Sequence, residues 1–154
     1  MSDTTTLHAT CVALSGNGIL LLGPPGAGKS DLALRLIDQP GRGTSGLLRH
    51  AQLVADDQVT VVRDNMQLTA SAPPQLAGLL EIRGLGLMRL PVLPSAVVGL
   101  AVRLADAATI ERMPYPAQSG FDVLGVTLPL VMIDPRMASA AARLRAAADW
   151  LGMV

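Results

Sequence analysis

The octapeptide Gly23-Pro24-Pro25-Gly26-Ala27-Gly28-Lys29-Ser30 decides the fold of this chain. It has the G-x-x-x-x-G-K-S spacing of a phosphate-binding loop, in which glycines let successive backbone N–H groups surround a phosphate. The apolar run 19–22 before it predicts a buried strand, and the leucines of residues 31–38 recur at helical spacing. A strand, a glycine loop and a helix N-terminus in this order predict that the loop binds a nucleoside triphosphate.

Two residues of the loop carry its chemistry. Lys29 is expected to neutralise the β- and γ-phosphates, and the Ser30 hydroxyl is expected to complete the coordination of Mg²⁺. The structural alternative is a glycine-rich turn that holds no ligand. The flanking strand and helix favour nucleotide binding, although they do not say what is done with the nucleotide.

Length and composition restrict the class of protein. The sequence of 154 residues predicts one domain over residues 1–154, with an aliphatic core because Trp, Tyr and Phe occur once each. Twelve basic and twelve acidic residues cancel, so charge gives no support for a nucleic-acid partner. A single cysteine, the lack of a signal-peptide pattern and the lack of an apolar run of about 18 residues predict a cytoplasmic protein without a membrane span.

The pattern along the chain predicts a mixed α/β fold. Residues 7–14 are expected to form a first strand, joined by Gly16-Asn17-Gly18 in an antiparallel hairpin to the strand before the phosphate loop. Residues 40–46 are rich in glycine and predict a flexible, disordered connection. Residues 52–55 predict a strand that ends at Asp56-Asp57 and continues through residues 58–62.

The second half of the chain gives weaker patterns. Residues 66–70 are expected to pair with the preceding strand, residues 76–80 to form at most a short helix, and residues 81–87 to form a strand end and a loop. The remaining elements are a buried strand at 96–104, one or two strands within 121–133 interrupted at Pro129, and a terminal helix at 138–151.

Asp56 and Asp57 stand where an apolar strand meets its loop. Neighbouring strand residues point to opposite faces, so the two carboxylates are expected to have different roles. One can bind Mg²⁺-coordinated water and the other can accept the proton of an attacking hydroxyl. The alternative is a turn with two solvated aspartates, which the nearby phosphate loop disfavours.

Three further polar residues are ambiguous. Glu81 and Arg83 alternate along a strand and are expected to share a face, either as a surface ion pair or as ligand-binding groups. A lone strand histidine such as His8 is more often structural, unless the fold places it beside an aspartate.

Four stretches together resemble the catalytic domain of HPr kinase/phosphorylase, in a short form found in alphaproteobacteria. They are the phosphate loop, residues 53–57, residues 72–74 and, above all, Glu81-Ile82-Arg83-Gly84-Leu85-Gly86-Leu87. The resemblance covers residues from about Leu7 to the terminal helix. It implies a mixed-sheet α/β P-loop nucleotide-binding domain like that of phosphoenolpyruvate carboxykinase, and assembly into a hexamer. The implied activity uses ATP and Mg²⁺ to phosphorylate a serine of the phosphotransferase-system carrier HPr, and inorganic phosphate to reverse that reaction.

The resemblance also assigns roles residue by residue. It implies catalytic roles for His8, Lys29, Asp56 and Arg83, with Asp56 as proton acceptor and His8 as the group that orients or tunes it. It implies that Ser30 and Glu81 bind Mg²⁺, while Asp57 keeps a metal-shell role.

Two departures from long members of the family concern the reverse reaction. Long members have an aspartate-arginine-leucine-glycine string, and the similar place here is Asp122-Val123-Leu124-Gly125, with Val123 in place of the arginine. They also have a basic loop near the C-terminus, where residues 133–137 contain only Arg136. We therefore expect a kinase with weak phosphorylase activity. Two other functions stay open from the residues alone, namely a small-metabolite kinase and a non-enzymatic nucleotide-sensing regulator.

Overall fold

The computed structural model describes residues 3–114 and 120–152. Its strands and helices, in chain order, are β1 (Asp3–Leu7), β2 (Thr10–Leu14), β3 (Asn17–Leu22), α1 (Lys29–Asp38), β4 (Ala51–Ala55), β5 (Val59–Asp64), β6 (Gln67–Ser71), β7 (Leu79–Ile82), β8 (Gly86–Arg89), β9 (Ser95–Leu104), β10 (Gly120–Val123), β11 (Val126–Ile133) and α2 (Ala140–Trp150). Short 3₁₀ turns occupy Pro74–Leu76 and Ala107–Thr109. Neither helix within the described ranges is long and apolar enough to span a membrane.

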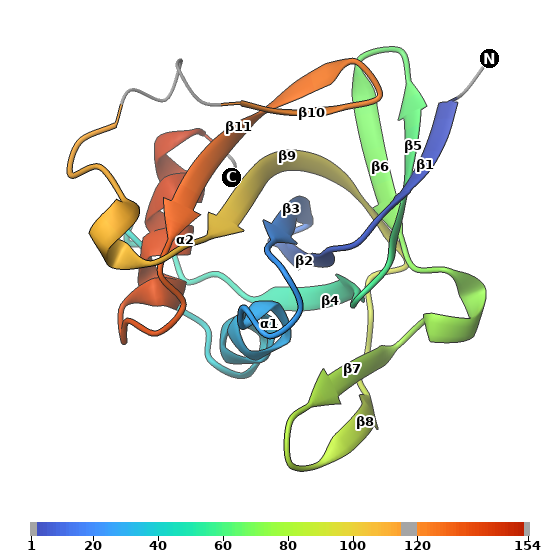
Figure 1. Cartoon of the computed structure of the whole chain (residues 1–154), viewed down its shortest axis with the longest axis horizontal. Helices are drawn as coiled ribbons and strands as arrows, with labels where there is room; N and C mark the ends of the chain where they lie inside the picture. The colour runs from blue at the N-terminus through green and yellow to red at the C-terminus, as the bar shows by residue number, and fades with distance from the viewer. Residues whose placement is uncertain (1–2, 115–119, 153–154) are drawn as a thin grey trace.

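One curled, mixed sheet forms the body of the molecule (Figure 1). Its strand order is β1-β5-β6-β9-β3-β2-β4, and β11 pairs with β9 and carries β10 at its other edge. The long strand β9 joins the two halves, because its first residues pair antiparallel with β6 and its later residues pair parallel with β3 and β11. The predicted mixed α/β architecture is therefore confirmed.

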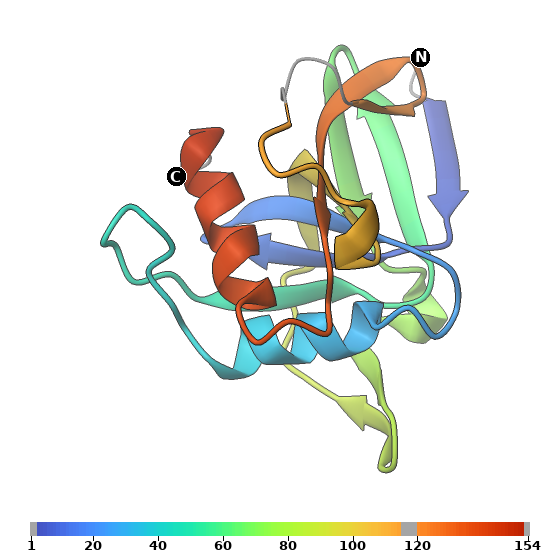
Figure 2. The same ribbon diagram turned by 60° about the vertical axis from the view of Figure 1, so that its left-hand side comes forward.

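Both faces of the central strands are buried, which explains why they are continuous apolar runs rather than alternating ones. On β2, Cys11 and Ala13 pack in the cluster enclosed by the curl of the sheet. Val12 and Leu14 pack in a second cluster beneath α1 and α2. The two helices cover this second face and contact each other (Figure 2). Cys11 is fully buried, and this burial raises the pKa of its thiol to about 12.

The three parallel strands place the phosphate loop at one edge of the sheet. β3, β9 and β11 end at Leu22, Leu104 and Ile133, and the loop follows the first of them directly. The segment after β11 lies against the loop, because a Cβ on Gly28 would be 3.4 Å from the Pro135 ring. The Arg35 Nη2 of α1 also donates a 2.6 Å hydrogen bond to the Pro135 carbonyl. Ligands commonly bind at this carboxyl edge of parallel strands.

Two strands predicted to be continuous are broken, and both breaks lie beside the phosphate loop. The predicted strand 7–14 is interrupted at His8 and Ala9, so that β1 pairs with β5 while β2 pairs with β3 and β4. The predicted continuation of residues 52–55 through 58–62 is also wrong. Asp57 has a φ of 69°, and the chain turns there from β4 into β5. The predicted hairpins β2–β3 and β5–β6 are confirmed.

The glycines of residues 81–87 form a β-hairpin instead of a strand end and a loop. β7 and β8 pair antiparallel, and Gly84 (φ 89°) and Gly86 (φ 104°) adopt backbone conformations that favour glycine. At 76–80, where at most a short helix was expected, a 3₁₀ turn ends at Leu76 and β7 begins at Leu79. Figure 1 shows this hairpin projecting away from the main sheet.

Two other predictions are corrected. Strand β11 continues through Pro129 instead of being interrupted there. Proline has no N–H to donate, but β11 pairs with β9 only from Leu130 onward, so the pairing with β9 loses no hydrogen bond. The segment 40–46, predicted to be disordered, is fastened to α2. There Asp149 Oδ2 accepts hydrogen bonds of 2.8 and 3.1 Å from the backbone N–H groups of Thr44 and Ser45.

Candidate active site

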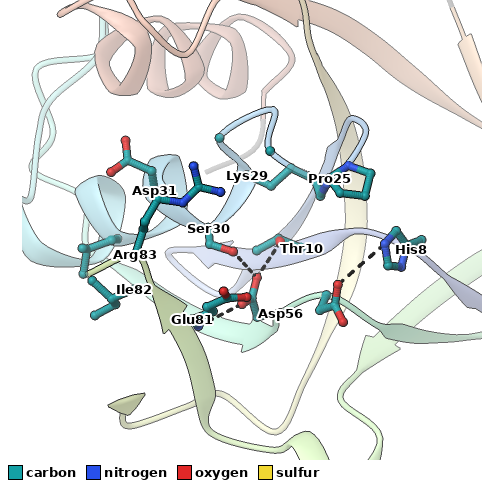
Figure 3. Close-up of a pocket in the computed structure, with 14 residues that line it drawn as sticks. His8, Thr10, Pro25, Lys29, Ser30, Asp31, Asp56, Glu81, Ile82 and Arg83 are labelled. Atoms are coloured by element: carbon teal, nitrogen blue, oxygen red, sulfur yellow. Dashed lines mark hydrogen bonds and ion pairs between the residues drawn. The ribbon is translucent and has the colours of Figure 1, made fainter. Parts of the chain in front are cut away.

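A cleft of about 490 Å³ lies between the phosphate loop, the turn after β4 and the end of β7 (Figure 3). Most of the predicted site residues line it, namely His8, Pro25, Gly26, Gly28, Lys29, Ser30, Asp56, Asp57, Glu81 and Arg83. Gly23, Pro24 and Ala27 belong to the loop but are not among the lining residues. The structure therefore gathers polar groups from four separate stretches of sequence around one cleft.

The phosphate loop has a backbone shape that its glycines make possible. Gly26 (φ 83°) and Gly28 (φ 104°) adopt left-handed conformations, and Gly28 caps the N-terminus of α1. The Ala27 N–H donates a 3.0 Å bond to the Pro24 carbonyl, which closes a turn. Backbone N–H groups at such a helix start, together with the helix dipole, form a site for phosphate.

Lys29 is buried at the base of the loop. Its Nζ donates hydrogen bonds to the Gly23 and Pro24 carbonyls at 2.6 and 3.1 Å. The ammonium group is thereby held inside the curve of the loop, where the charge of a bound phosphate would meet it.

Asp56 is the best-anchored acidic side chain of the cleft. It is only 7% exposed, and its carboxylate accepts hydrogen bonds from three different elements. Oδ1 accepts from Thr10 Oγ1 of β2 and Ser30 Oγ of α1, both at 2.8 Å. Oδ2 accepts from the backbone N–H of Glu81 in β7 at 3.2 Å. One carboxylate therefore links the phosphate loop, the sheet and the hairpin.

Asp57 differs from Asp56 in both backbone and exposure. Its φ of 69° and the 2.8 Å bond from the Gln58 N–H to the Asp56 carbonyl describe a tight γ-turn. Such a conformation is strained for a residue other than glycine, and strained backbone is frequent at functional sites. The two carboxylates diverge, as predicted, although a turn rather than strand alternation separates them.

The turn places Asp57 beside His8. His8 Nε2 lies 3.7 Å from Asp57 Oδ1, and both side chains are more than half exposed. The fold thus meets the condition under which the sequence favoured a functional histidine, because an aspartate adjoins it (Figure 3). Both groups are open to solvent, and at 3.7 Å their contact is too long for a hydrogen bond.

The hairpin brings Glu81 and Arg83 to the opposite wall. Both side chains are exposed and line the cleft, and within the described residues they form no ion pair with each other. Figure 3 shows Arg83 extending toward the N-terminal turn of α1, where Asp31 also lies. The two side chains line the same cleft, in agreement with the prediction that they share a face.

The donor set fits Mg²⁺ bound together with a nucleotide. No group of three or more His, Cys, Asp or Glu side chains that could hold a metal alone occurs in residues 3–114 and 120–152. Mg²⁺ at kinase sites typically uses one or two carboxylates in addition to substrate phosphates. Ser30, Glu81 and Asp57 line the cleft and offer oxygen atoms of this kind.

Thr10 is a cleft residue that sequence reasoning missed. It is fully buried, and its hydroxyl bonds Asp56 across 46 residues of sequence. The available signal was a hydroxyl at the start of an apolar strand, two residues after His8. That signal became meaningful only when the fold placed Asp56 opposite.

The two departures noted in the sequence lie outside the cleft lining. Val123 is buried in the hydrophobic core, only 3% exposed. Arg136 bonds both carboxylate oxygens of Asp134 at 3.1 and 2.9 Å and also lies 3.0 Å from Asp106. These bonds hold the pKa of Asp134 well below its usual range.

Comparison with known proteins agrees with this geometry. Residues 1–144 match the family model of the HPr Serine kinase C-terminal domain. The chain is 36% identical over 139 residues to the HPr kinase/phosphorylase of Cupriavidus necator, covering 84% of this chain and 40% of the relative. It is 36% identical over 145 residues to that of an Acidovorax species, covering 86% and 42%. The chain thus spans about two fifths of the length of these relatives.

A solved structure shows the same architecture. The Hpr(Ser) kinase/phosphatase from Coxiella burnetii superposes with a TM-score of 0.76 at 26% identity, covering 97% of this chain and 92% of that one. The fold and the family predicted from the glycine-rich motifs are thereby confirmed. This chain belongs to the family of the HPr serine kinase C-terminal domain.

Proposed function

We propose that this protein is an ATP- and Mg²⁺-dependent kinase that phosphorylates a serine of HPr, with weak phosphate-dependent reversal. The observation that carries the proposal is the Ser30–Asp56 bond of 2.8 Å, which joins the phosphate loop to a buried carboxylate inside one cleft. Phosphoryl transfer requires these groups to be fixed relative to one another, because catalysis there depends on position and electrostatics.

The phosphate loop supplies the nucleotide site in this proposal. Its backbone N–H groups and the Lys29 ammonium hold the β- and γ-phosphates, while the Ser30 hydroxyl and Glu81 face the metal. Bound Mg²⁺ supplies positive charge that offsets the charge of the phosphates.

Asp56 is proposed as the proton acceptor. A carboxylate offers about four lone-pair positions. Oδ1 accepts two hydrogen bonds and Oδ2 accepts one, which leaves one position on Oδ2 for the proton of an attacking serine hydroxyl. As the serine oxygen bonds to phosphorus, the bond to the ADP oxygen breaks and the serine proton passes to Asp56.

His8 and Asp57 complete the acceptor side of the cleft in this proposal. Asp57 follows Asp56 in sequence, and both members of the exposed pair line the same cleft. Its suggested task is to tune the charge around Asp56, with Asp57 also available to water in the metal shell. Arg83, on the hairpin, is suited to bind the equatorial oxygens of the phosphoryl group as it transfers.

The decisive experiment is incubation of the protein with ATP, Mg²⁺ and HPr, followed by mass spectrometry of intact HPr. One added phosphoryl group, located on a serine by fragmentation, supports the proposal. If small metabolites support ATP turnover and adding HPr does not increase it, the protein is a small-metabolite kinase. Tight ATP binding without turnover would favour a nucleotide-sensing regulator.

Two accompanying features belong to the same proposal. We expect homo-oligomerisation, as a hexamer, and a cytoplasmic location in which ATP and HPr are available. Light scattering coupled to size-exclusion chromatography gives the oligomer mass directly, and a monomer at micromolar concentration contradicts the hexamer.

A further inference from the structure

A single hydroxyl breaks the apolar pattern of β2. Residues 10, 12 and 14 share one face of this strand, and Val12 and Leu14 pack in the core beneath the helices. Thr10 is as fully buried as Val12 but carries an oxygen. A valine has nearly the same shape, so packing alone does not require a threonine at this position.

Burial of a hydroxyl is unfavourable unless the group finds a hydrogen-bond partner. Thr10 Oγ1 finds that partner in Asp56 Oδ1 at 2.8 Å. The bond crosses from β2 to the residue that follows β4, and it ends on a carboxylate that lines the cleft. The Thr10 hydroxyl therefore bonds a residue of the cleft, whereas Val12 and Leu14 on the same face pack in the core.

The three donors to Asp56 come from elements of different character. Glu81 belongs to the projecting β7–β8 hairpin, and Ser30 belongs to the loop expected to meet the nucleotide. Thr10 lies in β2, which is paired on both sides, with β3 and with β4. Of the three, Thr10 ties the carboxylate to the main sheet, where it pairs with Leu21 of β3.

We propose that Thr10 is a positioning residue that orients Asp56 for phosphoryl transfer. By occupying Oδ1 together with Ser30, it turns the open lone-pair position of Oδ2 toward the cleft. The kinetic part of this inference rests on the proposed function of Asp56. Its structural part, the orientation of the carboxylate, does not.

The test compares Thr10→Val, which removes only the hydroxyl, with Thr10→Ser, which keeps it. Losing a hydrogen bond to a charged group should lower kcat for HPr phosphorylation about 10- to 100-fold, with KM for ATP nearly unchanged. Thr10→Ser should restore most of the rate. Thr69→Val is the matched control, because Thr69 is a half-buried threonine of β6 that does not line the cleft.

A double-mutant cycle separates positioning from a general loss of structure. If Thr10 acts through Asp56, adding Thr10→Val to Asp56→Asn should change the rate by less than about twofold. Independent, multiplicative losses overturn the proposal, as does a Thr10→Val enzyme with normal kcat.

A crystal structure of the Thr10→Val variant gives a readout that needs no activity. The Asp56 carboxylate should leave its position in this variant and keep it in Thr10→Ser. An unmoved carboxylate overturns the inference even if HPr proves to be the substrate. A wild-type protein that fails to phosphorylate HPr overturns the proposed function, and the two crystal structures then decide the role of Thr10.

Discussion

The Ser30 hydroxyl donates a 2.8 Å hydrogen bond to Asp56 Oδ1, although 26 residues separate the two in sequence. The contact brings the start of α1 against the end of β4, so the nucleotide-binding loop and the acidic turn form one unit. The residue proposed to bind Mg²⁺ and the residue proposed to take the serine proton are thereby held at a fixed separation.

Replacing Asp56 with asparagine should lower kcat by about 10²- to 10⁴-fold while ATP binding is retained, because an amide cannot take up the acceptor proton. The Asp56 carboxylate accepts hydrogen bonds from Thr10, Ser30 and the Glu81 N–H. In the asparagine variant, an NH₂ group, which can only donate, takes the place of one of its oxygens. Steady-state kinetics with HPr and direct titration of ATP measure the two effects separately.

Asp57→Asn is the comparison that assigns the two carboxylates. If Asp56 is the base, the Asp57 variant should lose less activity than the Asp56 variant. The opposite pattern, with ATP affinity lost in Asp56→Asn and a normal rate at saturation, would make Asp56 the metal-shell residue and Asp57 the base.

Lys29→Ala should abolish phosphoryl transfer, because the buried ammonium is the charge held within the curve of the phosphate loop. Arg42→Ala is the control, since Arg42 is exposed and donates to the Gly46 carbonyl outside the cleft lining. Thermal unfolding should accompany the assay, because Lys29 also bonds two loop carbonyls. Near-normal transfer by a folded Lys29→Ala protein contradicts the assignment of the loop.

Arg83→Ala should lower kcat more than it raises KM for ATP, because a guanidinium aimed at the transferring group acts chiefly in the transition state. Arg89 provides a control on the same hairpin. It lies on β8, does not line the cleft and donates a 3.5 Å bond to the Ala77 carbonyl. If both alanine variants keep the wild-type kcat, Arg83 is a surface residue without a catalytic role.

The cluster of Asp134, Arg136 and Asp106 predicts a pH-dependent contribution to stability. Hydrogen bonds from Arg136 lower the pKa of Asp134 in the folded state. A depressed folded-state pKa stabilises the protein above the unfolded value of about 4, and this contribution is lost as pH falls toward the folded value. Urea unfolding should therefore show wild type to be more stable than Asp134→Asn at pH 7, with a smaller difference at about pH 3. A difference that grows on acidification contradicts this account.

Local patterns in the sequence were sufficient for the strand, loop and helix around Lys29, because neighbouring residues determine all three. The same holds for the β5–β6 hairpin. The two breaks beside the site were not predictable in this way. His8 interrupts a run that is apolar enough to continue, and Asp57 takes a strained φ that only the surrounding fold can hold.

Contacts between distant segments account for the remaining differences. Thr10 acquires its role from Asp56, and residues 40–46 are ordered by Asp149 near the end of α2. Neither relationship leaves a periodic signal, since each depends on how β2, β4 and the helices pack. The β7–β8 hairpin was not predicted, because residues 81–87 contain too many glycines for a regular strand pattern. Gly84 and Gly86 have positive φ angles in and beside the turn, and the two strands pair outside the main sheet.

We expect the forward reaction to be much faster than its reversal. Phosphate-driven dephosphorylation brings two highly charged groups into one cleft, so their repulsion must be offset by fixed cations, for which arginine is well suited. Val123 is apolar and buried in the core, and Arg136 is already bound by Asp134 and Asp106. Neither position therefore offers a spare positive charge.

We expect the reverse rate to be about 10²- to 10³-fold below the forward rate, the cost of losing one charge-assisted contact in a transition state. The measurement is pyrophosphate release from serine-phosphorylated HPr in excess phosphate, beside the forward rate of the same preparation. Equal rates would show that another cation compensates. The variants Arg112→Ala and Arg136→Ala then test two candidates for the compensating cation. Arg112 is exposed but does not line the cleft, so it would have to move to reach phosphate. Arg136 would first have to leave Asp106 and Asp134. A reverse rate that survives both substitutions places the compensating charge on a neighbouring subunit, which concentration-dependent activity would reveal.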